Sequence, residues 1–347
     1  MTLTGVRLSP IHQRLEALAG AASHAETHLG LSSDVDVVEI GRRLGHDLYC
    51  LSRVYFHESW PASVREGFTE SATRRLRRQS ADRFERKWLQ LRLGACTRGR
   101  VVADDVTPDL LHELDVSHCP VTRVMLTHGS CADTDWSIDR LNNDGAYAAS
   151  NLGVMSVRAN RAKGALDFSE ALAASRMASS SGGLLPIEWL RLAVLMEGPA
   201  YAQQPYRAPF LPLCAPLPCR SVRLASQQIQ RLFTLQARRP ADKNRLVRAF
   251  RPASSDERSR LRLDLLGDAV HHGLKRLTEV EQVWDVWLQP SVMDALVRWR
   301  DSLDDRGWAL AAAISGQIAG GQRVTADSLK EWCLPTRGYQ FSDFDKG

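Results

Sequence analysis

The feature of this 347-residue chain that most limits its possible folds is a change of pattern between Cys119 and Gly164. On both sides of this segment, apolar residues recur at the spacing of an α-helix. Within it, short apolar runs alternate with Asn, Asp and Gly, the residues that dominate turns. The pattern predicts a mainly α-helical protein with one small insert that contains β-structure.

The insert itself predicts a β-hairpin followed by a helix. Two strand-like runs, at 136–141 and 152–155, flank a turn-forming Asn-Asn-Asp-Gly sequence at 142–145. Ser156 belongs to the residue types preferred at helix N-caps, and Gly164 is typical of helix ends. A helix of two turns is therefore expected directly after the second strand.

Capping residues and helical spacing predict further helices in the flanks. Thr107 before Pro108 predicts one helix start, and Asp167 with Glu170 three residues later predicts another. The longest expected helix, 63–93, has apolar residues that can face a core while its arginines face outward. The expected helices cover about 34–57, 63–93, 108–114, 168–177 and 186–197, and helical periodicity returns over 221–312.

Composition divides the chain into four expected parts. A Ser-Ser-Ser-Gly-Gly run at 179–183 is typical of a flexible link, and six prolines lie between residues 198 and 220. The expected parts are a helical N-terminal region with a basic helix at 1–105, a ββα domain at 106–178, a Ser/Gly- and Pro-rich linker at 179–220, and a helical C-terminal domain at 221–347.

Positive charge is concentrated in two blocks. Residues 71–100 contain ten Lys and Arg against two acids, and residues 220–260 contain eleven against three. Such blocks indicate either an anionic partner, with nucleic acid the first candidate, or solvated helix faces. If the partner is DNA, the dense run of Arg74, Arg75, Arg77 and Arg78 is expected to contact phosphates without reading sequence.

The sequence also indicates a cytoplasmic protein with no membrane partner. The longest weakly polar stretch, 308–321, is shorter than the ~20 residues needed to cross a bilayer, and the N-terminus lacks the apolar core of a signal peptide. Seven cysteines, an odd number without a CxxC pair, favour reduced thiols over a disulfide framework.

The run SIDRLNNDGAY…NLGVMSVRANRAKG, within residues 137–164, resembles the HNH, or ββα-metal, nucleases. In that family an Asp-His pair ends the first strand, an Asn opens the second, and a His or Asn follows nine residues later on the helix. Asp139-Arg140, Asn151 and Asn160 occupy these places. The resemblance is strongest to the phage and proteobacterial branch in which Asp-Arg replaces Asp-His.

The resemblance implies one catalytic Mg²⁺ or Mn²⁺ ion. Asp139 and the side-chain carbonyl of Asn160 supply oxygen ligands of the kind that hard cations prefer, and phosphate oxygens of the substrate complete the shell. Asn151, in the family, ties the hairpin loop by hydrogen bonds and so positions the general base.

Arg140 stands where the family places its general-base His. Arginine has a pKa above ~12 and cannot accept a proton from water, so another base is required. His128 and His118, both upstream of the hairpin, are the candidates. Arg140 is instead suited to bind a phosphate in a bidentate manner.

The same segment offers two further candidate sites. His118, Cys119, His128 and Cys131 provide two Cys and two His, but adjacent ligands are awkward, and we expect the cysteines to pack as small apolar residues rather than bind structural Zn²⁺. On the expected helix, basic side chains are either phosphate contacts or a solvated face. These side chains are Arg158, Arg161 and Lys163.

Three functions remain open at this point. The first is an HNH-like, metal-dependent endonuclease that cleaves phosphodiester bonds in duplex DNA, with the basic blocks binding the duplex. The second is a catalytically silent DNA-binding module that keeps the scaffold without the base. The third is an interaction subunit of a larger bacterial assembly, whose basic helices face an acidic protein partner. Salt-dependent binding to DNA separates the first two from the third.

Overall fold

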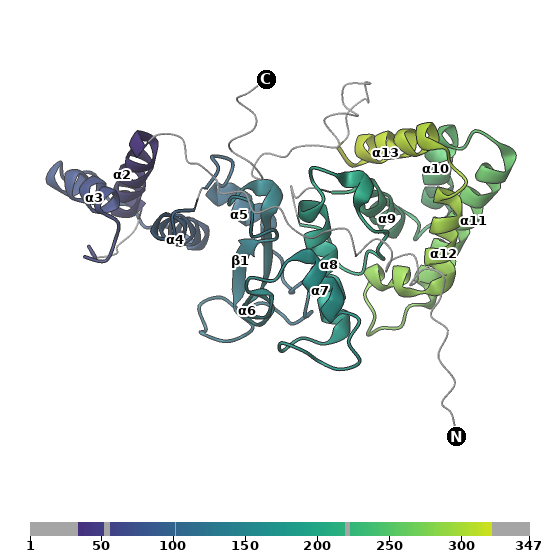
Figure 1. The fold of residues 1–347 in the computed structure, drawn as a ribbon, viewed down its shortest axis with the longest axis horizontal. Helices are drawn as coiled ribbons and strands as arrows, with labels where there is room; N and C mark the ends of the chain where they lie inside the picture. The colour runs from purple at the N-terminus through teal and green to yellow at the C-terminus, as the bar shows by residue number, and fades with distance from the viewer. Residues whose placement is uncertain (1–33, 52–55, 101, 219–222, 321–347) are drawn as a thin grey trace. The chain divides into compact units, whose positions relative to one another are not determined.

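The computed structural model describes residues 34–51, 56–100, 102–218 and 223–320 (Figure 1). The described part is mainly helical and contains one two-stranded antiparallel sheet, which confirms the predicted fold class at this level. None of its helices combines the length and apolar character needed to span a membrane.

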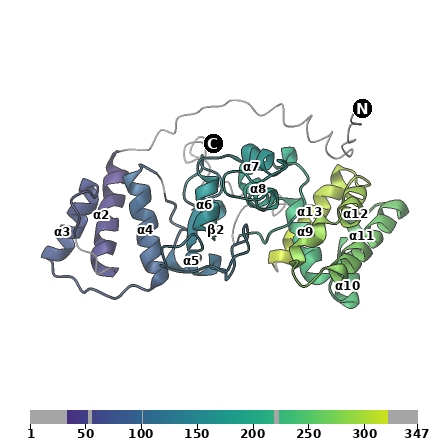
Figure 2. The same ribbon diagram turned by 90° about the horizontal axis from the view of Figure 1, so that it is seen from below.

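Three helices near the N-terminus share a small core of their own. These are α2 (Asp34–Leu51), α3 (Ala62–Thr73) and α4 (Arg83–Thr97), and Figure 2 shows α2 between the other two. A Cβ atom at Gly67 would lie 2.0 Å from the carbonyl oxygen of Arg42, so the close packing of α2 on α3 requires glycine there. The buried core residues are Leu44, Leu48, Val64, Phe68 and Leu89.

The expected single helix over 63–93 is wrong, because the chain forms two helices with a loop between them. The first helix ends with Arg75 in the left-handed region at φ 52°, and backbone N–H groups fold back onto the last turn. Asp82 then caps α4 and exchanges hydrogen bonds with Glu85 in a capping box. The dense arginine run therefore lies mostly in the connecting loop and not on a helix face.

The predicted hairpin followed by a helix is present. The hairpin consists of β1 (Trp136–Arg140) and β2 (Leu152–Ser156), and the helix is α6 (Val157–Lys163). A short helix, α5 (Pro108–Leu114), precedes them in the chain. Asp139 lies opposite Gly153 in the antiparallel register, and Leu152–Ser156 is buried along its whole length. The Ser156 side chain accepts the Ala159 N–H at the start of α6, as its residue type predicts.

The segment expected to be a linker contains a core helix. After α7 (Phe168–Ala174), whose Asp167–Glu170 capping box is confirmed, the chain forms α8 (Pro186–Ala200). Most of α8 is buried, because its apolar residues surround the helix instead of lining one face. The Ser/Gly run is exposed and is joined to this helix by one hydrogen bond, in which the Trp189 Nε1–H donates to the Ser181 carbonyl oxygen at 2.9 Å.

Helices of the C-terminal region complete the main core. They are α9 (Ala225–Gln236), α10 (Pro240–Phe250), α11 (Glu257–Arg276), α12 (Pro290–Arg300) and α13 (Asp305–Gly320). One continuous apolar cluster includes residues of the hairpin, of α8 and of these helices. Its largest fully buried side chains include Trp189, Trp287, Trp299, Phe233 and Phe250.

A buried ion pair joins the loop before the hairpin to this C-terminal region. Both Nη groups of Arg123 donate to the carboxylate of Asp285, one of them at 2.6 Å, and the carboxylate side chain is 6% exposed. Arg191 of α8 donates to the Val121 carbonyl oxygen of the same loop at 3.2 Å. Charge-assisted, bidentate contacts of this kind set the orientation of the loop as well as its distance.

An acid buried between α8 and α9 makes the folded state sensitive to pH. The Glu197 side chain accepts a hydrogen bond from Gln227 Nε2 at 2.9 Å, and its other oxygen has no partner among the described residues. Burial raises the pKa of Glu197 from 4.5 to about 8. Between about pH 4.5 and 8, the folded protein therefore keeps a proton on Glu197 that the unfolded chain has released. Because the folded state binds more protons over this range, the free energy of unfolding falls as the pH rises from about 4.5 to 8.

We predict that Glu197→Gln removes this pH dependence. The free energy of unfolding of the wild type, measured with urea at pH 5 and pH 8.5, should fall relative to that of the variant as the pH rises, because the Gln amide keeps the hydrogen bond and does not titrate. Replacement of the exposed Glu279 by Gln is the control. Equal pH dependence in wild type and Glu197→Gln would show that Glu197 is already ionised at pH 5.

Candidate functional site

The partly buried polar side chains of β1 lie on one face of the strand. Alternate residues of a strand point to opposite faces, so Ser137 and Asp139 face one way, and Trp136, Ile138 and Arg140 face the other. Helix α6 covers the first of these faces, through hydrogen bonds to both of its polar side chains. The candidate site is therefore the contact between β1 and α6.

Asp139 is engaged in a buried ion pair. The Lys163 ammonium donates to Asp139 Oδ2 at 3.1 Å and to Asn143 Oδ1 at 2.8 Å. The Lys163 side chain is 0% exposed and that of Asp139 is 20% exposed. Burial lowers the pKa of Lys163, and the negative charge of Asp139 opposes this shift. The ammonium is therefore enclosed by its two oxygen partners, and the expectation that it contacts a phosphate does not fit its position.

Asn160 lies one helical turn before Lys163 and faces the same strand. Its Nδ2 donates to the Ser137 Oγ at 2.8 Å. The two residues expected to bind the metal, Asp139 and Asn160, are thus on the same side of the hairpin. Each is already bonded to a neighbouring side chain within the ββα unit.

The loop-tying interaction expected for Asn151 is present. Its side-chain oxygen accepts the Asn142 N–H at 2.8 Å, while its Nδ2 donates to the carbonyl oxygens of Asn142 and Ala146 at 2.8 and 3.0 Å. The Asn151 residue is 0% exposed. These bonds close the loop between the two strands and supply partners to backbone groups that turn away from the sheet.

Arg140 points into the same loop and not toward solvent. Its Nη1 donates to the carbonyl oxygens of Asn143 and Gly145 at 2.6 and 2.9 Å, and its guanidinium lies 4.9 Å from the centre of the Tyr147 ring. The residue is 9% exposed. This placement corrects the expectation of a phosphate contact, because the guanidinium is committed to backbone carbonyls of its own loop.

The candidate bases are not brought to Asp139. His128 Nε2 lies 3.3 Å from Arg83 Nη1, and the His128 ring packs edge-on against Trp136. Since Trp136 and Asp139 point to opposite faces of β1, His128 is on the other side of the strand. His118 is exposed, with its Nδ1 2.9 Å from the Ser117 hydroxyl.

Cys119 serves as a hydrogen-bond acceptor inside the unit. Its buried sulfur accepts the N–H groups of Thr122 and Ser156 at 3.3 and 3.2 Å. Cys131 is exposed and has a left-handed backbone conformation at φ 57°. Across the described ranges, no three or more His, Cys, Asp or Glu side chains are grouped so that they can hold a metal ion.

A divalent cation at Asp139, which the family resemblance implies, would lie beside the Lys163 ammonium. Two unit charges roughly 4 Å apart repel each other by about 4 kcal/mol at an effective dielectric constant near 20, and a divalent ion doubles this. Asp139 is the one carboxylate that the described strand β1 offers on this face, and it already neutralises the lysine. The donor set does not fit a divalent cation while Lys163 is present.

The remaining residues expected to bind nucleic acid differ in their availability. Arg158 pairs with the buried Glu188, Arg161 pairs with Asp133 on the surface, and Arg74 pairs with Glu70. Arg78 donates to the Tyr49 carbonyl oxygen at 3.1 Å and lies over the Tyr49 ring. Within the described residues, the exposed guanidinium groups of Arg75 and Arg77 have no such partner.

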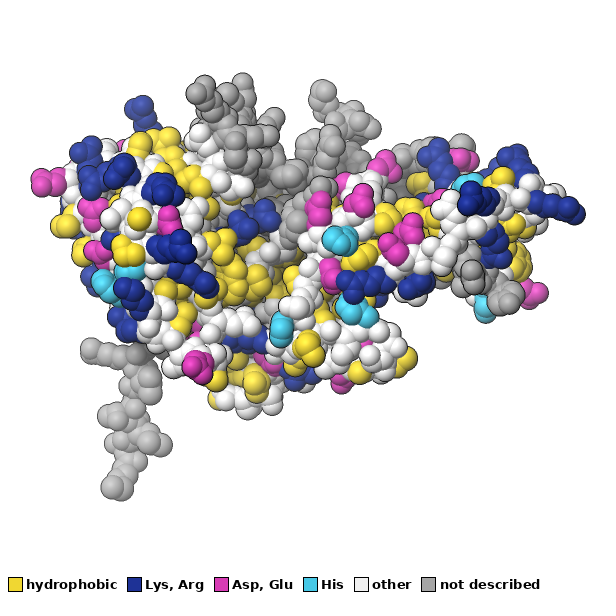
Figure 3. Space-filling model, turned by 180° about the vertical axis from the view of Figure 1, so that it is seen from behind, with side chains coloured by type: hydrophobic (Ala, Val, Ile, Leu, Met, Phe, Trp, Pro, Cys, Tyr) yellow, Lys and Arg dark blue, Asp and Glu magenta, His cyan; other side chains and the backbone are white. Residues whose placement is uncertain are grey.

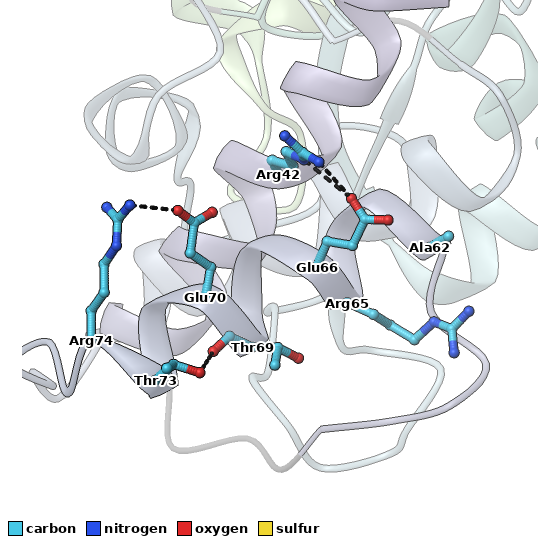
Figure 4. Close-up of a pocket in the computed structure, with 8 residues that line it drawn as sticks. All are labelled: Arg42, Ala62, Arg65, Glu66, Thr69, Glu70, Thr73 and Arg74. Carbon is cyan, nitrogen blue, oxygen red and sulfur yellow. Dashed lines mark hydrogen bonds and ion pairs between the residues drawn. The ribbon is translucent and has the colours of Figure 1, made fainter.

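The surface beside Arg74 is hollowed, and two of the three arginines that line the hollow are in ion pairs. Arg42, Glu66, Glu70 and Arg74 line a shallow hollow of about 720 Å³ along α3. Figure 4 shows the ion pairs Arg42–Glu66 and Arg74–Glu70 across it. Arg65, which also lines the hollow, has no acidic partner among the described residues, so the three arginines of the hollow face two glutamates.

A more available basic surface, called the α10 surface below, consists of Arg238, Arg239 and Arg248, just before and along α10. These three residues are exposed and have no acidic partner among the described residues. Figure 3 shows Lys and Arg side chains spread over the molecule on the face it presents. Arg248 and Arg251 also line a hollow of about 320 Å³. In the sequence, the α10 surface is indicated only by the second basic block. That block does not show which of its arginines are paired with acids in the folded protein.

Comparison with known proteins adds no assignment. Neither a scan of protein-family models nor searches of curated proteins and of solved structures returns a match to this chain. The resemblance to HNH nucleases therefore depends on the residues of segment 119–164 alone. The structure contributes the hairpin, the helix and the contacts between them.

We predict that Asp139→Ala destabilises the protein strongly, although a partly exposed polar residue would ordinarily change stability by less than ~1 kcal/mol. The substitution leaves the enclosed Lys163 ammonium without its counter-charge, which should lower the free energy of unfolding by about 3–5 kcal/mol. Asp133→Ala is the matched control, since it breaks the exposed pair with Arg161 and should cost below ~1 kcal/mol. Similar values for the two variants in urea denaturation would show that the Asp139 pair is solvated.

Proposed function

We propose that this chain is a DNA-binding protein in which an HNH-like ββα unit is flanked by mainly helical regions that present exposed arginines. The observation that carries the proposal is the set of exposed arginines without acidic partners among the described residues, at Arg75 and Arg77 and on the α10 surface. Such groups are free to bind phosphates without first breaking an internal ion pair. They belong to the two basic blocks of a chain whose remainder is acidic overall.

Phosphate contacts of this kind give affinity rather than sequence recognition. A guanidinium that binds a phosphate oxygen releases a condensed counterion from the DNA, so the affinity falls steeply with salt. Exposed arginines that are paired, such as Arg161 with Asp133, can exchange the acid for a phosphate at small cost, because surface ion pairs contribute about 0–1 kcal/mol. The proposed partner is duplex DNA, bound through its backbone.

A second candidate function is metal-dependent cleavage of the bound DNA. It is favoured by one observation, namely that Asp139 and Asn160 are on the same side of the hairpin. Against it stand the Lys163 ammonium at Asp139, the inward direction of Arg140 and the position of His128 on the opposite side of β1. An active nuclease needs a group that takes a proton from water. The Lys163 ammonium and the Arg140 guanidinium already carry their protons, and His128 lies on the other side of the strand.

The salt dependence of DNA binding tests the proposed contacts. Replacement of Arg238, Arg239 and Arg248 together by Gln should weaken binding to all sequences alike and reduce the slope of log K against log salt by up to ~2.7, at ~0.9 for each lost contact. The measurement is fluorescence anisotropy with a labelled duplex between about 50 and 200 mM salt, concentrations over which phosphate contacts typically change affinity by about 10³ or more.

The matched control replaces three exposed arginines that have acidic partners, Arg42, Arg43 and Arg300. This control should change the slope less than the α10-surface variant does. Equal slopes for wild type and the α10-surface variant would assign those arginines to solvent. Binding that is absent in the wild type at about 50 mM salt would favour an acidic protein partner over DNA.

A nicking assay decides between the two candidate functions. Supercoiled plasmid incubated with the wild type should yield no more relaxed circle with Mg²⁺ or Mn²⁺ than with EDTA, since no described base faces Asp139. The comparison includes Asp139→Asn at equal DNA occupancy. Nicking that needs the divalent ion and disappears in Asp139→Asn would establish cleavage and overturn the proposal of a silent binding module.

A further inference from the structure

We infer that the Lys163 ammonium takes the place of a divalent cation at Asp139, so that the ββα unit is stabilised by its own positive charge. The ammonium contacts oxygens from two parts of the unit, Asp139 in β1 and Asn143 in the loop, and is itself the last residue of α6. It therefore connects strand, loop and helix at one point. A cation bound by the same two oxygens would likewise connect the strand to the loop.

The placement follows from spacing along α6. Lys163 lies three residues after Asn160, so both side chains emerge on the same face of the helix, toward β1. Asn160 reaches Ser137 and Lys163 reaches Asp139, which are two residues apart on one face of the strand. The lysine is the longer of the two helix side chains, and its ammonium ends at the carboxylate.

The loop holds its oxygen toward the ammonium by contacts of its own. The Asn143 Nδ2 lies 3.4 Å from the carbonyl oxygens of Gly164 and Leu166, directly after α6, while Asn143 Oδ1 accepts from Lys163. Arg140 donates to the Asn143 carbonyl oxygen from the other side. The fold therefore directs the Asp139 and Asn143 side-chain oxygens toward the Lys163 ammonium.

Two consequences distinguish an internal ammonium from a bound ion. Chelators and divalent ions should leave the wild type unchanged, because a covalently held charge does not dissociate. Removal of the ammonium should leave a carboxylate and amide oxygens without their cation, which is a donor set that Mg²⁺ and Mn²⁺ prefer. Lys163→Ala is thus expected to gain a divalent-ion site at Asp139.

The test is direct binding of Mn²⁺ to the full chain without DNA, followed by the loss of the electron paramagnetic resonance signal of free Mn²⁺. We expect Lys163→Ala to bind one Mn²⁺ at least about tenfold more tightly than the wild type, and Asp139→Asn/Lys163→Ala to lose this gain. Lys243→Ala is the matched control, because Lys243 also pairs with an aspartate, Asp268 at 2.6 Å, and should gain no site.

Thermal unfolding keeps the test informative if Lys163→Ala is too unstable to titrate. Its midpoint should then rise with Mn²⁺ concentration, because an ion that binds only the folded state stabilises it, and the midpoint of the wild type should not. The inference is overturned if Lys163→Ala gains neither Mn²⁺ affinity nor Mn²⁺-dependent stability, or if the wild type binds Mn²⁺ in a manner that Asp139→Asn abolishes. Neither readout involves DNA. If the inference about Lys163 fails, the proposed DNA binding is therefore still tested separately by its salt dependence.

Discussion

The enclosed ion pair between Lys163 and Asp139 is the interaction on which the geometry of the ββα unit depends. An ammonium with no exposure to water needs its charge and its hydrogen bonds met by protein groups, and Asp139 and Asn143 meet them. This requirement fixes the end of α6 against β1 and against the loop. The position of Asn160 on the same helix face, and its bond to Ser137, follow from that alignment.

Two polar side chains that the sequence singles out stabilise the loop of the ββα unit itself. Asn151 and Arg140 donate to loop carbonyl oxygens, and both are buried. An ion pair between Arg123, in the loop before the hairpin, and Asp285, shortly before α12, also connects the unit to the C-terminal region. The exposed arginines without acidic partners among the described residues lie in the helical flanks, so the proposed binding and the scaffold belong to different parts of the chain.

Features set by neighbours in sequence could be predicted, and features set by distant contacts could not. The Ser156 cap, the Asp167 capping box and the hairpin depend on local residue types, and all three are present. The break in the expected 63–93 helix escaped prediction because Arg75, and not glycine, takes the left-handed position. The burial of Lys163 escaped it because a lysine in a basic run on a helix ordinarily faces water.

A double-mutant cycle on the ion pair tests the central claim most directly. The free energies of unfolding of wild type, Asp139→Asn, Lys163→Met and the double variant give the coupling between the two side chains independently of any ligand. We predict that the double variant is less destabilised than the sum of the two single variants, by more than ~1.5 kcal/mol. Additive effects, within the ~0.5 kcal/mol seen for independent sites, would contradict the claim, because the lysine would then not be the counter-charge of Asp139.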